Sequence, residues 1–296
     1  MGWTSNDDFI TEVTVNGKYW RNDWNKQTGA AAYTAGRWYD MSSLGGSPIA
    51  NAFTGTSLAA QVPTESTGFG LYHGGDVSTD TKHVINVAAV TGVATGVPGV
   101  LMLVDLCLYY PGINMNLNTR QTLDNTTTLT RYTDGKGLRS FLVARATTGA
   151  TAHAIDNTAS TGTAYTNTAD ATKEHPGTVQ CTASAIVPHI VHSGTAANNF
   201  GPFIPLAAGD VGIKKYTFFK LTAASGTAST AALCICKPLL NIPVTTVSVL
   251  SERDLMNQLP SLPQIVDGAC LVWLYFAGAA TAASTNFYGS IDLGWG

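Results

Sequence analysis

The sequence predicts a mainly β protein, an antiparallel β-sandwich or barrel of the jelly-roll-like kind, with an irregular N-terminal arm and one or two short helices. Three observations lead to this class. Many short segments are rich in Val, Ile, Thr, Tyr and Phe, and Gly, Asn, Asp and Pro separate them, as is typical of successive strands and turns. Two longer apolar runs are bordered by proline or glycine. Only two segments carry the signals that begin a helix.

The first helix signal lies in SNDDFITEV. Ser5 is a good N-cap residue, and Asp7 and Asp8 in the first turn interact favourably with the helix dipole. Asn16-Gly17 is a turn signal that ends the segment. We therefore expect a short helix over residues 6–13.

The first 60 residues differ from the rest and are expected to form an aromatic-rich arm, with residues 61–296 forming the β-sandwich or barrel domain or two packed β subdomains. Large aromatic side chains on an irregular segment need a surface to bury against. The arm either folds back on its own domain or docks on a sister subunit or partner, in which case removing residues 1–40 should leave a soluble β domain. The candidate interface residues are Trp3, Trp20, Trp24, Trp38 and Tyr39.

The run VPGVLMLVDLCLYYPGIN, residues 97–114, is the most apolar stretch in the first half of the chain. A membrane span needs about 20 apolar residues, and Pro98, Asp105 and Pro111 interrupt the run too often. It ends in Tyr-Tyr-Pro-Gly, which is a turn signal. We predict a strand at residues 100–110 that is buried on most of both faces, so Asp105 requires a partner.

Further strands are predicted from the same kind of composition. ACLVWLYFAGAA, residues 269–280, resembles the first apolar run and is expected to be a second buried strand. The other predicted strands are residues 82–90, 140–146, 163–167, 178–186, 215–221, 231–237 and 286–292.

The second helix signal is SERDLMNQLP. Ser251 and Asp254 form an S-x-x-D capping box. Leu255 and Leu259 would share one helix face, and Pro260 would end the segment. A short helix is therefore expected over residues 252–259.

Charge is scarce in this chain, which has 12% charged residues and a formal net charge of −3, whereas soluble domains carry about 25%. No cluster of Lys and Arg is visible, which argues against direct nucleic-acid binding. The N-terminus MGWTSNDDFI lacks the basic and apolar regions of a secretory signal, so we expect synthesis in a cytosol. The five cysteines stand among apolar neighbours and are expected to be buried free thiols.

The stretch YHGGDVSTDTKH holds the first set of residues that could ligate a metal: His73, Asp76, Asp80 and His83. The alternative is a Gly-rich, solvated loop that leads into the next strand. We favour the loop, because no supporting pattern of ligand spacing accompanies these residues.

Two other stretches contain residue types that occur in binding sites. His189 and His192 in PHIVH could bind zinc, but no third ligand is visible and ordinary hydrogen-bonded loop histidines are favoured. TDGKG lacks the spacing and the helix of a P-loop and is expected to be a turn. Because no nucleophile elbow, zinc-protease or dinucleotide motif is present, we expect no catalytic activity, no cofactor and no essential metal.

Several stretches together carry a resemblance that spans nearly the whole chain: RWYDMSSLGGSP, GVPGVLMLVDLCLYYPGIN, TLDNTTTLTRYTDGKG, ASAIVPHIVHSGTAANNFGPFIPLAAGDVGIK, SERDLMNQLPSLP and FYGSIDLGWG. They resemble virion structural proteins of tailed bacteriophages. The resemblance implies a non-enzymatic subunit, most simply a capsid decoration or cement protein. It would contact the major capsid protein or other virion subunits and form a homo-oligomer in the virion, without binding a membrane.

Two rival classes remain open. A tail- or fibre-associated protein with a carbohydrate-binding β-sandwich would use exposed Trp and Tyr for sugar stacking. A hydrolase with an unrecognised site would need a cleft with ionisable residues of shifted pKa. The position of the aromatic side chains distinguishes the first rival from the cement protein.

Overall fold

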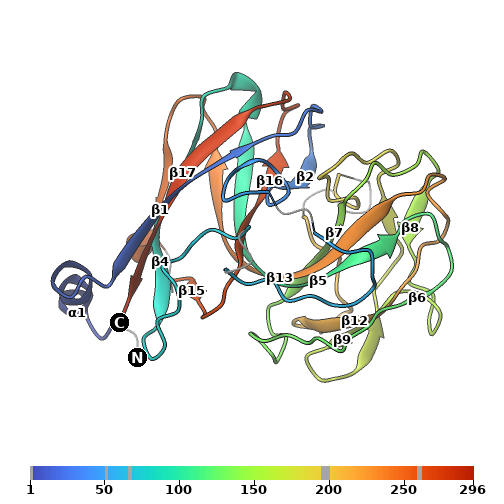
Figure 1. Ribbon diagram of the computed structural model, residues 1–296, viewed down its shortest axis with the longest axis horizontal. Helices are drawn as coiled ribbons and strands as arrows, with labels where there is room; N and C mark the ends of the chain where they lie inside the picture. The colour runs from blue at the N-terminus through green and yellow to red at the C-terminus, as the bar shows by residue number, and fades with distance from the viewer. Residues whose placement is uncertain (1–2, 51–52, 66–68, 195–200, 259–261) are drawn as a thin grey trace.

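A computed structural model describes residues 3–50, 53–65, 69–194, 201–258 and 262–296. The protein is mainly β, as predicted, and its sheets are antiparallel. Figure 1 shows two lobes side by side along the long axis, with the N-terminal helix at the far end of one lobe. The sheets pack face to face as in a sandwich, and within the described part of the chain none closes into a barrel.

The first lobe is built on a sheet that we call the outer sheet. Its strand order is β14-β4-β17-β1-β3, with β15 also beside β4. The bounds of these strands are β1 Tyr19–Gln27, β3 Gly46–Ser47, β4 Lys82–Thr91, β14 Ser251–Asp254, β15 Gln264–Ile265 and β17 Asn286–Trp295.

The central sheet has the order β2-β16-β5-β13-β7 and the distal sheet, in the second lobe, the order β10-β9-β12-β6, while β11 pairs with β8. The central strands are β2 Arg37–Asp40, β5 Gly99–Asn114, β7 Arg139–Ala144, β13 Thr230–Val244 and β16 Leu271–Ala277. The others are β6 Gln121–Thr122, β8 His153–Ile155, β9 Ala164–Asn167, β10 Thr172–Glu174, β11 Val179–Cys181 and β12 Ile213–Phe219.

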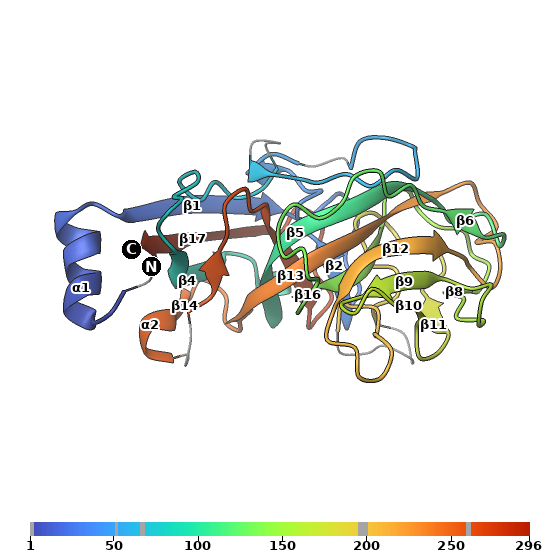
Figure 2. The same ribbon diagram turned by 90° about the horizontal axis from the view of Figure 1, so that it is seen from below.

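The long strands β5 and β13 pair with each other and run through both lobes (Figure 2). Leu101 and Leu103 of β5 belong to the core beneath the outer sheet, whereas Leu108 and Tyr110 belong to the core beneath the distal sheet. The register between β5 and β13 shifts between these positions, as β-bulges allow. Val104 and its neighbours on the other face are covered by a third core, so the predicted strand at residues 100–110 is buried on both faces.

Asp105 lies on β5 between the two cores, and its predicted need for a partner is met by Arg131. The Arg131 Nε and Nη2 atoms donate to Asp105 Oδ2 at 2.8 Å and Oδ1 at 2.7 Å. Both side chains are buried. The backbone N–H of Cys270 donates to Asp105 Oδ1 at 2.9 Å. A buried carboxylate is stable here because its charge is paired and its oxygens are hydrogen-bonded.

The first 60 residues are more regular than expected and do not form a separate arm. β1 pairs with β17 from Tyr19↔Gly294 to Gln27↔Asn286, and β2 pairs with β16. β1 and β2 therefore belong to the outer and central sheets, and residue 60 does not mark a structural boundary. β1 was not predicted, because its sequence YWRNDWNKQ is mostly polar and its partner strand lies at the other end of the chain.

The first predicted helix is confirmed. It consists of α1, Asn6–Ile10, followed by a π-helical turn, η1, Thr11–Val15. Ser5 is its N-cap, and the Ser5 Oγ atom accepts from Asp8 N at 3.1 Å. A 3₁₀ turn, η3, covers Ala94–Gly96.

The second predicted helix is shorter than expected and begins later. Ser251–Asp254 forms β14 against β4 rather than a capping box, because pairing with a strand satisfies its backbone groups. α2 covers Leu255–Gln258, and Asp254 Oδ1 accepts from Met256 N at 2.9 Å as the actual cap. The expectations for Leu259 and Pro260 lie outside the described residues.

Most other strand predictions match observed strands, but residues 178–186 shorten to β11 and residues 269–280 shorten to β16. The five cysteines are free and buried, as predicted, and burial raises the pKa of the Cys181 thiol to about 12. TDGKG is a turn in which Gly135 and Gly137 have φ of +73° and +71°. Among the described residues, no helix combines the length and apolar character needed to cross a bilayer.

Candidate functional site

Three of the five candidate interface residues lie in the core of the protein itself. Trp24, Trp38 and Tyr39 are 3%, 5% and 1% exposed. The Trp24 ring lies 5.1 Å from that of Trp273, and the Tyr39 ring stacks on Tyr33 at 3.8 Å. These three side chains are buried by strands of the same chain, so this structure does not present them to a second chain.

The other two candidates lie nearer the surface. Trp3 is partly buried and packs edge-on against Phe9 with ring centroids 4.7 Å apart. Trp20 is 38% exposed, and its ring meets that of Tyr72 at 5.3 Å and 90°. Tyr72 is 49% exposed. Trp20 and Tyr72 therefore form an exposed aromatic pair.

The four possible metal ligands of residues 72–83 divide into two groups. His73 and Asp76 come together with Glu65, and one ligand atom from each lies within 4.8 Å of the others. Asp80 instead pairs with Lys18 at 2.9 Å, and the His83 ring packs against Trp3. The stretch is thus neither a simple solvated loop nor a site that brings all four residues together.

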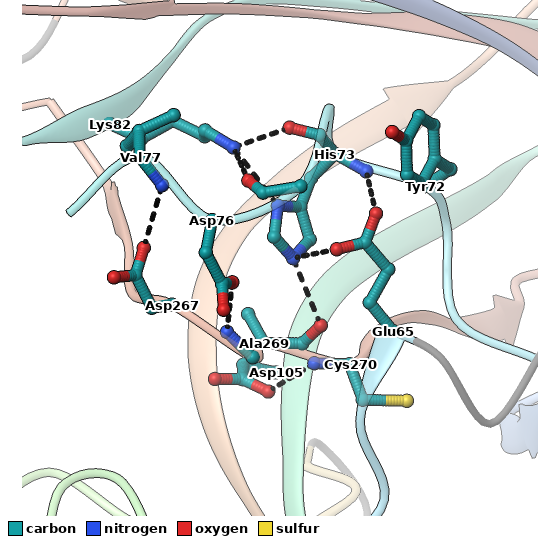
Figure 3. Close-up of polar contacts among 12 residues, drawn as sticks. Glu65, Tyr72, His73, Asp76, Val77, Lys82, Asp105, Asp267, Ala269 and Cys270 are labelled. Carbon is teal, nitrogen blue, oxygen red and sulfur yellow. Dashed lines mark hydrogen bonds and ion pairs between the residues drawn. The ribbon is translucent and has the colours of Figure 1, made fainter.

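His73 connects a lysine to a carboxylate, as Figure 3 shows. The Lys82 Nζ atom lies 3.1 Å from His73 Nδ1, and it also donates to the carbonyl oxygens of His73, at 2.6 Å, and of Gly75. His73 Nε2 lies 3.1 Å from Glu65 Oε2 and 3.2 Å from the carbonyl oxygen of Ala269. Because Lys82 is a donor and both groups near Nε2 are acceptors, Nδ1 accepts and Nε2 carries the proton.

Burial explains the electrostatics of this chain of contacts. Desolvation lowers the pKa of His73, and the nearby Lys82 ammonium lowers it further. Desolvation likewise lowers the pKa of Lys82, against the opposing effect of Glu65. His73 is therefore neutral at neutral pH. Its Nδ1 atom accepts a hydrogen bond from the Lys82 ammonium, and its Nε2–H group donates one to the Glu65 carboxylate.

These contacts favour a proton rather than a metal ion on the Nε2 atom of His73. A metal bound to Nε2 would require the proton to move to Nδ1, which then needs an acceptor. The group at Nδ1 is Lys82 Nζ, whose other contacts show it acting as a donor. Asp76 also already accepts from Gly268 N at 2.7 Å through Oδ1.

Glu65 is one of the residues that line an open hollow of about 500 Å³, which we call the Glu65 hollow. Its side chain is 13% exposed. β1 contributes Asn22 and the loop after β3 contributes Pro48 and Ile49, while Tyr72 stands at the rim. Glu65 is the charged residue among those that line the hollow.

Sequence reasoning missed three residues of this site: Glu65, Tyr72 and Lys82. Glu65 comes eight residues before His73, beyond any recognised ligand spacing. The position of Lys82 could have been recognised from the sequence. It begins an apolar strand and is two residues before Val84, so both side chains point to the same, buried face. A lysine at such a position needs buried acceptors.

The two histidines of PHIVH are buried loop residues, as favoured from the sequence. His192 Nε2 lies 2.9 Å from the carbonyl oxygen of Pro202, and His189 Nε2 lies 3.3 Å from Ser193 Oγ. Desolvation lowers the pKa of each to about 3. Both are therefore neutral at physiological pH and act as hydrogen-bonding core residues.

A second surface feature is the uncovered face of the outer sheet, which we call the outer face. A depression of about 220 Å³ lies there between β14 and β1. Ala88 and Val90 of β4 and Tyr288 of β17 line it, together with the polar Asn86 and Ser290. Leu250 and Tyr288 are 55% and 44% exposed. Arg21, Asp23 and Glu252 form its charged rim.

Comparison of the chain with protein-family models, with curated proteins and with solved structures found no match in any of the three.

Proposed function

We propose that the protein is a non-enzymatic structural component of a tailed-bacteriophage particle, a decoration or cement protein that stabilises the capsid through contacts with its subunits. It would act as a homo-oligomer bound to the major capsid protein or another virion subunit, after assembly in the host cytoplasm. The sequence resemblance motivates this class. The structural observation that supports it is the outer face.

The outer face has the features of an unfilled contact surface. Apolar side chains line its depression together with the polar Asn86 and Ser290 and with charges of both signs. Leu250 and Tyr288 are large, mostly apolar side chains that are exposed on it. Val249, just before β14, is 54% exposed as well. Contiguous apolar surface rimmed by polar groups is typical of protein–protein contacts. β14 is also an edge strand, paired only with β4 among the described strands.

The test is incorporation into particles. The protein would be supplied during phage growth as wild type and as the double variant Leu250→Glu/Tyr288→Glu, which places two charges on the outer face. We expect the variant to remain folded and to be lost from purified particles, measured as copies per capsid protein and by particle imaging. Val211→Glu is the matched control, since Val211 is 60% exposed near the distal sheet.

Full incorporation of the double variant would exclude the outer face as the contact surface. Absence of the wild-type protein from purified particles would contradict the proposed function itself. A position on the tail rather than on the shell would retain the structural class and replace the capsid role.

A further inference from the structure

We propose that the Glu65 hollow is a binding site for a neutral saccharide. The proposal is independent of particle assembly, because it concerns a different surface from the outer face and can be tested on the isolated protein. It rests on an exposed aromatic pair, on a fixed carboxylate and on the size and lining of the hollow.

The aromatic wall supplies an apolar ring face. Tyr72 at the rim is 49% exposed. The Trp20 ring holds it edge-on at 5.3 Å, and Ile49 and Pro48 add apolar surface across the hollow. The C–H face of a pyranose ring is apolar and packs on such surfaces, as other rings pack on aromatic side chains.

The carboxylate supplies acceptors for hydroxyl groups. His73 donates to Glu65 through its backbone N–H, 3.3 Å from Oε1, and through Nε2 at 3.1 Å from Oε2. A carboxylate has about four acceptor positions, so both oxygens retain capacity for ligand hydroxyls. Hydrogen bonds from a hydroxyl to a carboxylate are among the stronger neutral-to-charged contacts.

The wall that carries these groups is fixed before any ligand arrives. The Asn22 side chain donates from Nδ2 to the carbonyl oxygen of Tyr72 at 2.8 Å. Leu71 N donates to Leu271 O at 2.8 Å and ties the same segment to β16. Gly74 has φ of +83° and a Cβ there would lie 3.1 Å from the Trp20 ring, so glycine lets the loop pack against the indole. Such preorganisation lowers the entropic cost of binding.

The electrostatics favour a neutral ligand over a charged one. Glu65 repels anions, which disfavours acidic sugars and phosphates. Its attraction for a cation is weakened, because the Lys82 ammonium faces it through neutral His73. The volume of about 500 Å³ falls in the usual range of roughly 300–1,000 Å³ for small-ligand sites. A hydroxyl-rich neutral ring or pair of rings matches these properties.

The experiment measures binding of defined probes to the full-length protein. Maltotriose, cellotriose, mannotriose and triacetylchitotriose are the neutral probes, sialyllactose is the anionic probe and butylammonium the cationic one. Saturation-transfer NMR and titration calorimetry would be run at millimolar probe concentration. We expect at least one neutral trisaccharide to bind and the two charged probes to bind more weakly or not at all.

Variants then locate the site. Tyr72→Ala should weaken binding of the same trisaccharide roughly tenfold, because it removes the aromatic ring face. Glu65→Gln should weaken it as well, and its melting temperature would be measured because Glu65 also contacts His73. Val211→Ala, which truncates an exposed side chain near the distal sheet, is the matched control and should bind as the wild type does.

Three results would overturn the proposal: no neutral trisaccharide binds at millimolar concentration, the cationic probe alone binds, or Tyr72→Ala binds the trisaccharide with unchanged affinity. None of these results bears on incorporation into particles, so failure of the saccharide site and failure of the proposed function are distinguishable.

Discussion

At the scale of single residues, the chain places its few buried charges in contact with specific partners. Asp105 is paired with Arg131 at the junction of two cores. Asp40 is fully buried and accepts from the Ser42 backbone and hydroxyl and from Ser43, although burial still raises its pKa. A protein with few charges depends strongly on those it buries, because an unpaired buried charge is far costlier than a lost surface pair.

The first prediction concerns the Asp105–Arg131 pair. Arg131→Met leaves the Asp105 carboxylate buried without its cation and should lower the free energy of unfolding by about 3–5 kcal/mol. Urea denaturation at neutral pH measures it. The control is Lys136→Ala, which breaks the exposed Lys136–Asp134 pair at 3.4 Å and should change the free energy of unfolding far less, because solvent screens that pair. Equal losses from the two variants would contradict this account.

The second prediction is a loss of stability in mild acid. Desolvation lowers the pKa of His175 to about 4 and that of His189 and His192 to about 3, whereas unfolded histidine titrates near ~6.5. The unfolded chain therefore binds more protons below that pH. The stability that comes from burying these histidines in their neutral form is fully present above pH ~6.5. As the pH falls toward ~4, the free energy of unfolding decreases by about 1.4 kcal/mol per pH unit for each histidine.

The measurement is urea denaturation at pH values between 7 and 5, on the wild type and on His175→Gln. The variant should show a smaller dependence of the unfolding free energy on pH, since one histidine no longer takes up a proton on unfolding. Parallel pH dependences for the two proteins would show that His175 is not buried in its neutral form.

At the scale of elements, the N-terminal segment combines two parts of different importance. α1 and η1 contain no buried residues. β1 pairs along its whole length with β17, and β2 forms an edge of the central sheet. Two of the four tryptophans that suggested a docking arm, Trp24 of β1 and Trp38 of β2, are buried in the core of the protein.

The third prediction separates these parts by truncation. Removing residues 1–17 should leave a soluble, folded protein, because α1 and η1 contain no buried residues and Trp3, which packs against His83, is itself only partly buried. Removing residues 1–40 also removes β1 and β2 and exposes Trp273 and Phe287 of the core, so it should give insoluble protein. This reverses the expectation for a detachable arm. Solubility and circular dichroism of both truncations are the test, and a soluble, β-rich protein lacking residues 1–40 would contradict it.

At the scale of the whole molecule, two lobes share one pair of strands. β5 and β13 contribute side chains to the core under the outer sheet and to the core under the distal sheet. The Asp105–Arg131 pair lies between them, and Cys270 and Ala269 connect it to His73 and the Glu65 hollow (Figure 3). Neither lobe retains a complete core if the other loses these strands.

The fourth prediction is a single cooperative unfolding transition. Because β5 and β13 belong to both lobes, the lobes should melt together, and the calorimetric and van't Hoff enthalpies should agree. Differential scanning calorimetry measures both. Two resolved transitions would show that the lobes are energetically independent.

The sequence by itself determined the properties that depend on local composition. The apolar runs at residues 97–114 and 269–280 predicted buried strands, Ser5 predicted a helix start, and Asp105 on such a strand required a buried partner. These follow from side-chain chemistry and from neighbours within a few residues. Local sequence did not predict the secondary structure where pairing with a distant strand determines it. Ser251–Asp254, for example, forms a strand because β4 lies beside it.

The tertiary structure alone decided which distant residues meet. Nothing in the local pattern joins Tyr19–Gln27 to Asn286–Trp295, Arg131 to Asp105, or Glu65 to His73 and Lys82. Contacts of this kind arise when strands far apart in sequence are brought into register to bury their apolar faces. The Glu65 hollow and the outer face are therefore properties of the assembled sheets, which single segments of the sequence do not encode.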